Sequence, residues 1–252
     1  MNQRVLVTAG ASGIGREIAR AFAAKGAKVF VCDIDGKALA ALSKETPGIE
    51  TMRCDVSKRA EIEQMTAAAL QSLGGLDVLV NNAGVAGPTV PVEEVSPDEW
   101  DKVVQINLTA TFDVTRLAIP ALKQSSAGVV IVMSSAAGRF GYPNRVAYAA
   151  TKWGLVGFTK TLAMELGRFG IRANAILPGT VEGERIQRVF EGRAKISGRS
   201  VDEVREASMQ NQSLQALVDP RDIAALAVFL ASDAGKSISG QALAIDNDIQ
   251  RL

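Results

Sequence analysis

Short apolar runs of strand length alternate with longer segments of helical periodicity, and this alternation limits the possible folds more than any other feature. The strand-like runs lie at 5–7, 29–32, 52–54, 76–80, 129–133, 173–177 and 242–245. Apolar residues recur at helical spacing in the segments 14–25, 37–44, 58–73, 96–122, 148–168 and 220–230. The pattern predicts an α/β fold, a doubly wound parallel sheet with helices on both faces. Ligands of such sheets bind beyond the carboxyl ends of the strands.

The length and net charge of the chain limit the number of domains and the kinds of partner that it can bind. The 252 residues are 47% hydrophobic, which fits one catalytic domain spanning residues 1–252. A net charge of +1 gives no basic face for nucleic acid or a membrane surface. No apolar stretch approaches the roughly 18 residues of a membrane span, and the run at 5–7 is too short for a secretory signal. We therefore expect a cytoplasmic protein with a small-molecule substrate and neither a nucleic-acid nor a membrane partner.

The chain contains no histidine. This absence excludes nucleophilic catalysis by Ser-His-Asp or Cys-His arrangements and metal sites ligated by histidine. The two cysteines, Cys32 and Cys54, cannot form a usual zinc site, and we expect both to be buried, reduced thiols. No metal is predicted. Proton transfer near neutral pH must therefore use Asp, Glu, Lys or Tyr with a shifted pKa.

A glycine-rich turn at residues 8–15 joins the first strand to the first helix. Its glycines let the backbone approach a pyrophosphate, and the helix N-terminus supplies N–H groups and a positive dipole end. The predicted cofactor residues of the turn are Gly10, Ser12, Gly13, Ile14 and Gly15.

The second strand ends at Asp33, where an acidic residue is placed to hydrogen-bond the ribose hydroxyls of a dinucleotide. Its charge would repel a 2′-phosphate, and no basic residue follows it, so NAD is favoured over NADP. The alternative is that Asp33 only begins the turn at residues 33–36.

Tyr148 and Lys152 lie four residues apart at the start of a helical segment, so their side chains share one face. Tyrosine has an ordinary pKa near 10, and a nearby ammonium lowers it by favouring the phenolate. Ser135 lies just beyond the central strand, where its hydroxyl can bind the substrate oxygen. Asn107, inside a helical segment, can fix a water beside Lys152, or is simply a tolerated helical asparagine.

These motifs together resemble the short-chain dehydrogenase/reductase family, single-domain type, over essentially the whole chain. The turn at 8–15 is similar to the family's Thr-Gly-x-x-x-Gly-x-Gly loop, and residues 81–84 match its Asn-Asn-Ala-Gly motif. Residues 54–56 resemble its adenine-contacting strand end, and 178–179 resemble its Pro-Gly turn beside the nicotinamide. The family's catalytic tetrad is matched in order and spacing by Asn107, Ser135, Tyr148 and Lys152.

The resemblance implies a Rossmann-type sheet, a nicotinamide cofactor and a homotetramer. It implies that Tyr148 is the acid/base, that Ser135 donates to the substrate oxygen, and that Lys152 binds the ribose. Asn107 would belong to a proton relay. The further cofactor residues that it implies are Asp55, Val56, Asn82, Ala83, Gly84, Tyr148, Lys152, Pro178, Gly179 and Val181.

Two positions depart from the family pattern. Ala9 stands where the first glycine is usual, and we expect ordinary φ/ψ angles there, with a slightly reshaped turn that still binds the cofactor. Residues 246–248 read Asp-Asn-Asp where Asp-Gly-Gly is more usual, so contacts near the last strand are less transferable.

The segment 182–217 is rich in polar residues and follows a strand end, which is typical of a substrate lid; the alternative is a solvated surface excursion. Arg185 and Arg188 lie on it, and Arg145 precedes Tyr148 by three residues. Arginines that approach one pocket from two sides suit a carboxylate, sulfonate or phosphate. We therefore predict a substrate site formed by Ser135, Arg145, Tyr148, Arg185 and Arg188. The arginines can instead pair with surface glutamates at 182, 184 and 191.

The sequence thus predicts an NAD-dependent oxidoreductase that transfers a hydride between nicotinamide and a small alcohol or ketone. An anionic hydroxy or keto compound, such as a sugar acid or a short sulfonate, is the favoured substrate. The alternatives are a 3-oxoacyl-thioester reductase, a neutral sugar or polyol dehydrogenase, and a non-catalytic NAD-binding regulator. A sugar-nucleotide epimerase would need a larger C-terminal domain than this length allows.

Overall fold

The computed structural model describes residues 3–250 and contains one seven-stranded parallel sheet in the order β3-β2-β1-β4-β5-β6-β7. The strands are β1 Arg4–Thr8, β2 Lys28–Asp33, β3 Ile49–Arg53, β4 Val78–Asn81, β5 Val129–Met133, β6 Arg172–Pro178 and β7 Ala242–Ile245. The order reverses between β1 and β4, as in a Rossmann-type doubly wound sheet. The predicted fold class is confirmed.

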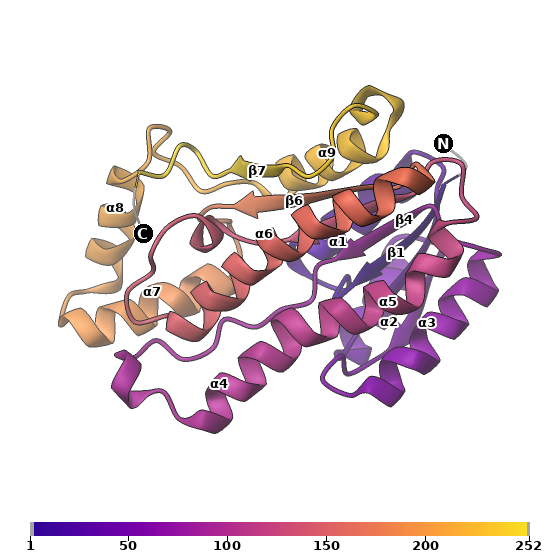
Figure 1. The fold of residues 1–252 in the computed structure, drawn as a ribbon. Coiled ribbons are helices and arrows are strands. Elements are labelled where there is room, and N and C mark those ends of the chain that lie inside the picture. Colours follow the sequence, from indigo (N-terminus) through magenta and orange to yellow (C-terminus); the bar gives the residue numbers. More distant parts are fainter. Residues whose placement is uncertain (1–2, 251–252) are drawn as a thin grey trace.

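Nine α-helices belong to the described part of the chain (Figure 1). They are α1 Gly13–Ala24, α2 Gly36–Glu45, α3 Arg59–Leu73, α4 Pro97–Val104, α5 Ala110–Leu122, α6 Val146–Leu166, α7 Glu184–Ser197, α8 Val201–Gln210 and α9 Pro220–Ala231. Helices α1, α2 and α9 pack on one face of the sheet, and α3, α5 and α6 pack on the other. Alternate residues of each strand point to opposite faces of the sheet and so belong to two separate hydrophobic cores. In β1, Val5 and Val7 face α1, and Leu6 faces the opposite helical layer.

The helical segment predicted at 96–122 is divided by a π-helical turn, Gln105–Thr109, between α4 and α5. Asn107 lies inside this turn and is fully buried. π-Helical turns interrupt the regular hydrogen-bond ladder and are frequent at functional sites.

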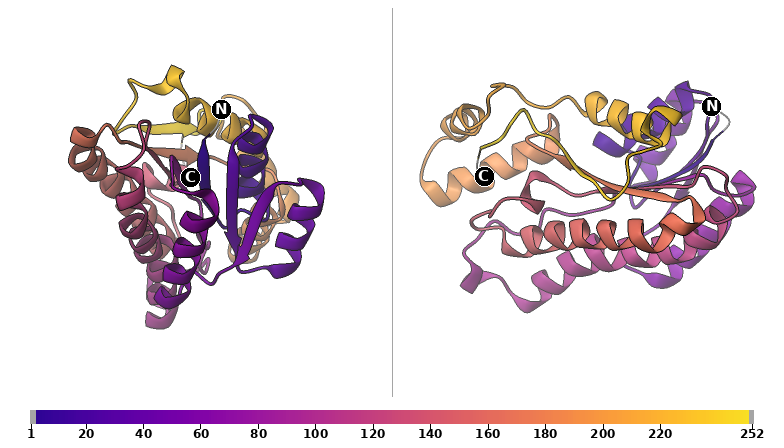
Figure 2. Two further views of the ribbon diagram at one scale, coloured as in Figure 1. Left: turned by 90° about the vertical axis from the view of Figure 1, so that its right-hand side faces the viewer. Right: turned by 45° about the horizontal axis from the view of Figure 1, so that its top comes forward.

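The segment 182–217 contains two helices that sequence periodicity did not reveal, α7 and α8. They enclose a small core of their own, centred on Phe190, Ala194 and Val204. Strands β6 and β7 point toward the end of the molecule at which α7, α8 and the C-terminus lie (Figure 1). Figure 2 shows the same two helices at the end opposite the N-terminus. The segment 182–217 therefore lies at the carboxyl edge of the sheet.

Cys32 and Cys54 are buried and form no disulfide, as the sequence predicted. Within residues 3–250, no helix combines the length and apolar character that crossing a bilayer requires. In the same range, no cluster of acidic and cysteine side chains is suited to a metal ion.

Candidate active site

The glycine-rich turn between β1 and α1 departs from the conformation expected at its alanine. Ala9 has φ of 49°, so the prediction of ordinary angles there is wrong. The Asn82 side-chain amide donates to Thr8 O at 3.1 Å and to Ala9 O at 2.9 Å, and both bonds stabilise the turn in this shape. A Cβ at Gly15 would collide with Ala9 O and the Asn82 amide, so only glycine fits there. Tertiary contacts therefore impose a left-handed conformation that costs an alanine about 1–2 kcal/mol.

The N-terminal end of α1 suits a pyrophosphate. Ser12 and Gly13 are exposed, and the Ser12 side chain makes no capping hydrogen bond to the helix. Gly10 is buried, and a Cβ there would meet the side chain of Val31. Glycines without side-chain bulk and N–H groups at a positive helix end are the features that a dinucleotide requires, so these residues fit the cofactor. Ile14 lies half-buried beside them.

Asp33, at the end of β2, lies directly beside this turn. Its carboxylate accepts from Ala11 N at 3.1 Å and from Asp35 N at 3.1 Å. The second bond belongs to the turn into α2, for which Asp35 is the N-cap. Asp33 thus orders the turn that leads to α2, as the alternative reading supposed, and also places a carboxylate next to the cofactor loop.

The other predicted cofactor residues follow β3, β4 and β6 at the same edge of the sheet: Asp55, Val56, Asn82, Ala83, Gly84, Gly179 and Val181, with Pro178 ending β6. Thr8 Oγ1 accepts from Asn82 N at 3.0 Å and Ala83 N at 3.1 Å, which ties the ends of β1 and β4 together. A Cβ at Gly179 would come within 2.6 Å of Asp246, so the ends of β6 and β7 can approach only because Gly179 has no side chain.

Lys152 lies buried in α6, one turn after Tyr148. Its Nζ donates to Met133 O at 2.7 Å and lies 5.6 Å from the centre of the Tyr148 ring. Burial lowers the pKa of the Lys152 ammonium to about 8, although the Tyr148 phenolate opposes the shift. A Cβ at Gly84 would lie 3.6 Å from Nζ and 3.1 Å from Asn107 Oδ1. Gly84 therefore leaves space beside the ammonium.

Burial by itself would raise the pKa of the Tyr148 phenol. The charges of Arg185, Lys152 and Arg145, with a hydrogen bond from Ser135, outweigh burial and hold the pKa below its ordinary value. This electrostatic environment is the one that proton transfer by a tyrosine requires near neutral pH. Ser135 Oγ also accepts from Ala137 N at 3.2 Å, which fixes the hydroxyl in the loop after β5.

The Asn107 side chain connects the loop after β4 with α6. Its Oδ1 accepts from Val85 N at 2.7 Å, and its Nδ2 donates to Val85 O at 3.0 Å and Thr151 Oγ1 at 3.1 Å. Thr151 immediately precedes Lys152 in α6. These bonds give the buried asparagine a structural role beside the Tyr148–Lys152 pair.

Two of the three predicted substrate arginines meet at Tyr148. The Cζ atoms of Arg145 and Arg185 lie 4.9 and 5.7 Å from the centre of its ring. Arg188 is exposed and, within residues 3–250, shows no hydrogen bond, ion pair or ring contact. In the same range, no ion pair joins Arg145, Arg185 or Arg188 to the glutamates at 182, 184 and 191.

Several site contacts were absent from the sequence prediction. Arg139 Nη2 pairs with the buried Asp246 at 2.8 Å and links the loop after β5 to the loop after β7. Arg193 Cζ lies 4.9 Å from the centre of the Tyr142 ring, and Tyr142 packs edge-on against Tyr148. For Arg193, the only signal in the sequence was the high arginine content of the segment 182–217, which does not indicate which arginine faces inward.

A Rossmann-type edge that fits a dinucleotide, next to a half-buried Tyr148 and a buried Lys152, defines an oxidoreductase with a nicotinamide cofactor. A family model described as enoyl-(acyl carrier protein) reductase matches residues 8–247. The chain is 41% identical to D-beta-hydroxybutyrate dehydrogenase of Cupriavidus necator over 241 residues, 93% of each chain. It is 33% identical to 3-oxoacyl-(acyl-carrier-protein) reductase of Thermotoga maritima, over 97% of this chain and 96% of that relative.

Two solved structures are close in shape. An actinorhodin polyketide ketoreductase variant with NADPH has a TM-score of 0.92 at 34% identity, covering 96% of this chain and 95% of its own. An NAD+-bound xylitol dehydrogenase has a TM-score of 0.92 at 27% identity, covering 97% of both chains. The chain belongs to the short-chain dehydrogenase/reductase family. It is a dehydrogenase or reductase that acts on CH–OH groups.

Proposed function

We propose that the protein is an NAD-dependent dehydrogenase of a small anionic hydroxy compound, such as a hydroxy acid, a sugar acid or a short hydroxysulfonate. The observation that carries this proposal is the buried guanidinium of Arg145 beside Tyr148. Arg145 is 3% exposed, and within residues 3–250 it forms no ion pair. Burial lowers the pKa of this guanidinium.

A buried cation without a counter-charge is costly for the folded protein. Two kinds of contact offset part of that cost. Arg145 Nη2 donates to Ala86 O at 2.8 Å, and Arg145 Cζ lies 5.0 and 4.9 Å from the centres of the Tyr142 and Tyr148 rings. Its Nε is buried and has no hydrogen-bond partner among the residues that the structure describes. An anionic substrate would supply the missing charge next to the proton-transfer group.

Two relatives are named for substrates that carry a negative charge, as the proposed substrate does. D-beta-hydroxybutyrate dehydrogenase, 41% identical, is named for a hydroxycarboxylate. A 2-dehydro-3-deoxy-L-rhamnonate dehydrogenase (NAD(+)) of a Sphingomonas species, 38% identical over 70% of this chain, is named for a sugar acid and for NAD. Both names describe carboxylates, and this supports the anionic class.

The residues divide the chemistry as follows. In oxidation, Tyr148 as phenolate accepts the hydroxyl proton of the alcohol, and Ser135 hydrogen-bonds the same oxygen. The buried Lys152 ammonium favours the phenolate, and we assign to it the binding of the nicotinamide ribose. The nicotinamide ring, when bound, supplies the hydride acceptor for oxidation or the hydride donor for reduction. In reduction, Tyr148 returns its proton to the carbonyl oxygen.

The preference for NAD rests on Asp33. Its carboxylate lies at the end of β2, within 3.1 Å of Ala11 N in the cofactor loop. The following residue is the exposed Ile34, so no cation at this position offsets the repulsion of a 2′-phosphate. The related structures include both NADPH-bound and NAD+-bound enzymes, so the choice in this chain depends on such local charges.

The substrate class is tested by comparing an anion with its neutral counterpart. We would first screen 3-hydroxybutyrate, gluconate and 2-hydroxyethanesulfonate with NAD, following reduced nicotinamide by absorbance. For 3-hydroxybutyrate the neutral counterpart is 1,3-butanediol. Arg145→Gln should lower kcat/KM for the anion about 100-fold and for the diol only a few-fold, because a charge-assisted bond is lost only with the anion. Arg205→Gln, an exposed arginine of α8, is the control of equal charge change. Equal losses on both substrates would contradict the proposal.

Two other substrate classes have relatives among the dehydrogenases and reductases. A 3-oxoacyl-thioester reductase is the first alternative, and the Thermotoga maritima relative belongs to that class. A neutral sugar or polyol dehydrogenase is the second, represented by L-fucose and D-threitol dehydrogenases. Neither substrate gives the Arg145 charge a partner, and the first normally demands NADPH. A non-catalytic regulator would not need the four catalytic side chains to be present.

We also propose that the protein works in the cytoplasm as a homotetramer. The exposed apolar side chains of Phe112 in α5 and of Trp153 and Met164 in α6 support burial of these helices against another copy. Light scattering coupled to size-exclusion chromatography would measure the assembly, and a monomer at micromolar concentration would contradict it.

A further inference from the structure

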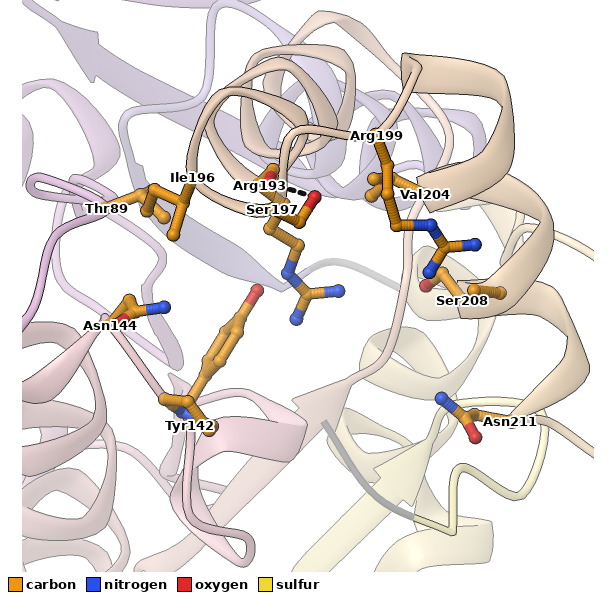
Figure 3. A pocket seen from close by; sticks show the side chains of 12 residues that line it. Thr89, Tyr142, Asn144, Arg193, Ile196, Ser197, Arg199, Val204, Ser208 and Asn211 are labelled. Atoms are coloured by element: carbon orange, nitrogen blue, oxygen red, sulfur yellow. Dashed lines mark hydrogen bonds between the residues drawn. The ribbon is translucent and has the colours of Figure 1, made fainter.

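A cavity lies beside the catalytic site, between the loop that precedes α6 and the helices α7 and α8 (Figure 3). Its volume is about 280 Å³, and its walls include Tyr142, Asn144, Arg193 and Arg199. No acidic residue of the described part of the chain lines it. The catalytic residues do not line it either, so this cavity is separate from the position of the reacting atoms.

The cavity is lined by two guanidinium groups, neither of which forms an ion pair within residues 3–250, although the charge of Arg199 acts on the Glu203 carboxylate and helps to lower its pKa. Figure 3 shows Arg193 and Arg199 directed into it from α7 and from the turn before α8. Arg193 Cζ lies 4.9 Å from the centre of the Tyr142 ring, and Arg199 Nη2 donates to Glu203 O at 3.2 Å. Among the ion pairs found within residues 3–250, none includes either arginine.

Hydroxyl and amide groups complete the polar wall. Ser197 and Ser208 line the cavity, with Asn144 opposite them on the loop before α6. Ser197 Oγ donates to Arg193 O at 2.8 Å, which fixes its position on α7. Ile196 and Val204 supply apolar surface next to these groups. A cavity with two cations, hydroxyl groups and a partly apolar wall suits an anionic group attached to a short carbon chain.

Tyr142 joins this cavity to the catalytic site. The centre of its ring lies 5.0 Å from the Cζ atom of Arg145, which also contacts Tyr148, and 4.9 Å from the Cζ atom of the cavity-lining Arg193. The Tyr142 and Tyr148 ring centres are 6.4 Å apart. Tyr142 therefore contacts one cationic group that lies beside Tyr148 and a second that lines the cavity.

We propose that the cavity beside Tyr142 is a distal anion subsite, and that the substrate carries two anionic groups. This inference rests on the proposed function: Arg145 binds the anionic group near the reacting carbon, and Arg193 with Arg199 binds the second. The substrate class is an α,ω-dianionic hydroxy or keto compound, either a dicarboxylate or a hydroxy acid that ends in a phosphate.

Binding of inert analogues to the enzyme with NADH measures the subsite without turnover. We would determine Kd by calorimetry for straight-chain dicarboxylates of four to eight carbons and for monocarboxylates of equal length. One dicarboxylate should bind at least 10-fold more tightly than its monocarboxylate, because only it reaches both cationic groups. A chain of that length with a terminal phosphonate distinguishes a phosphate ligand, which should bind still more tightly, from a carboxylate ligand.

The variants separate the two subsites. The double variant Arg193→Gln, Arg199→Gln should remove the dicarboxylate advantage and leave the monocarboxylate Kd within about two-fold. Arg193→Lys should keep part of the advantage, because it keeps the charge. Arg205→Gln lies on α8 outside the cavity and should change neither ligand.

Two results would overturn the distal subsite: no dicarboxylate binds better than its monocarboxylate, or the advantage survives in the double variant. Failure of the proposed function looks different, because Arg145→Gln would then leave the monocarboxylate Kd unchanged. The Arg193 and Arg199 variants therefore test the distal subsite, and the Arg145 variant independently tests the proposed function.

Discussion

The guanidinium carbon of Arg185 lies 5.7 Å from the centre of the Tyr148 ring, although the two residues belong to different helices. Arg185 is in the first turn of α7, and its Nη1 donates to Gly84 O at 3.3 Å, beside the cofactor edge. The segment 182–217 therefore contributes a positive charge directly to Tyr148, the residue to which we assign proton transfer. Burial raises the Tyr148 pKa, and the charge of Arg185 is the largest of the effects that lower it.

This relationship predicts how the pH profile responds to Arg185→Gln. Oxidation needs Tyr148 as phenolate, so kcat/KM should rise with pH through the lowered Tyr148 pKa. Removal of the Arg185 charge disfavours the phenolate, raises that pKa and moves the rising limb to higher pH, by about 0.5–1 unit. Profiles of kcat/KM for oxidation from pH 6 to 10.5 measure the shift.

Arg185→Lys is the matched variant, since it keeps a charge near the ring and should shift the limb less. Arg205→Gln removes an equal charge from α8 and should leave the limb in place. A limb unmoved in Arg185→Gln, or moved to lower pH, would contradict the assignment.

Tyr148→Phe should remove proton transfer while preserving the site. The ring and its packing against Tyr142 remain, and only the hydroxyl is lost. We expect kcat to fall by about 10²–10⁴-fold, the contribution of a positioned acid/base group. Affinity for NADH, measured by fluorescence titration, should stay within a few-fold of the wild-type value. Substantial activity in this variant would show that another group transfers the proton.

Asp33→Asn should weaken the discrimination between NAD and NADP. The asparagine keeps an oxygen that can accept from Ala11 N, so the loop geometry survives, but the charge that repels a 2′-phosphate is lost. The ratio of kcat/KM for NAD over NADP should fall by about 10-fold or more. Asp35→Asn, at the exposed N-cap of α2, is the control and should leave the ratio unchanged. If the ratio is unaltered in Asp33→Asn, residues other than Asp33 determine the preference for NAD over NADP.

Ala9→Gly should stabilise the protein. Ala9 has φ of 49°, a conformation that costs alanine energy and costs glycine almost nothing. The gain exceeds the extra chain entropy of glycine, and we expect about 0.5–1 kcal/mol, which corresponds to about 1–4 °C in Tm for a domain of this size. Differential scanning calorimetry measures it. Ala11→Gly, at a buried alanine without a positive φ, should lower Tm instead; a loss of stability in Ala9→Gly would contradict the prediction.

The sheet and its order of elements were predictable because they depend on local periodicity. Strands β1, β2 and β5 and helices α1 and α9 coincide with the predicted segments to within one or two residues. Helices α7 and α8 were not predicted, since few apolar residues mark them and their small core forms only when both helices meet. The π-helical turn at Asn107 was hidden for a similar reason: its side chain is fixed by Val85 and Thr151, which lie on other elements.

The sequence by itself determined the chemistry of this protein. Without histidine, proton transfer requires a residue such as Tyr148, and its four-residue spacing from Lys152 places both on one helical face. Only the tertiary structure decided which charges surround that tyrosine. Arg145 and Arg185 lie over its ring, Arg188 shows no ring contact within residues 3–250, and Arg193 lies against Tyr142. The direction in which an arginine of the segment 182–217 points depends on how that segment packs. Sequence periodicity does not predict this packing. The same is true of Ala9, where contacts with Asn82 impose a backbone conformation that alanine does not favour.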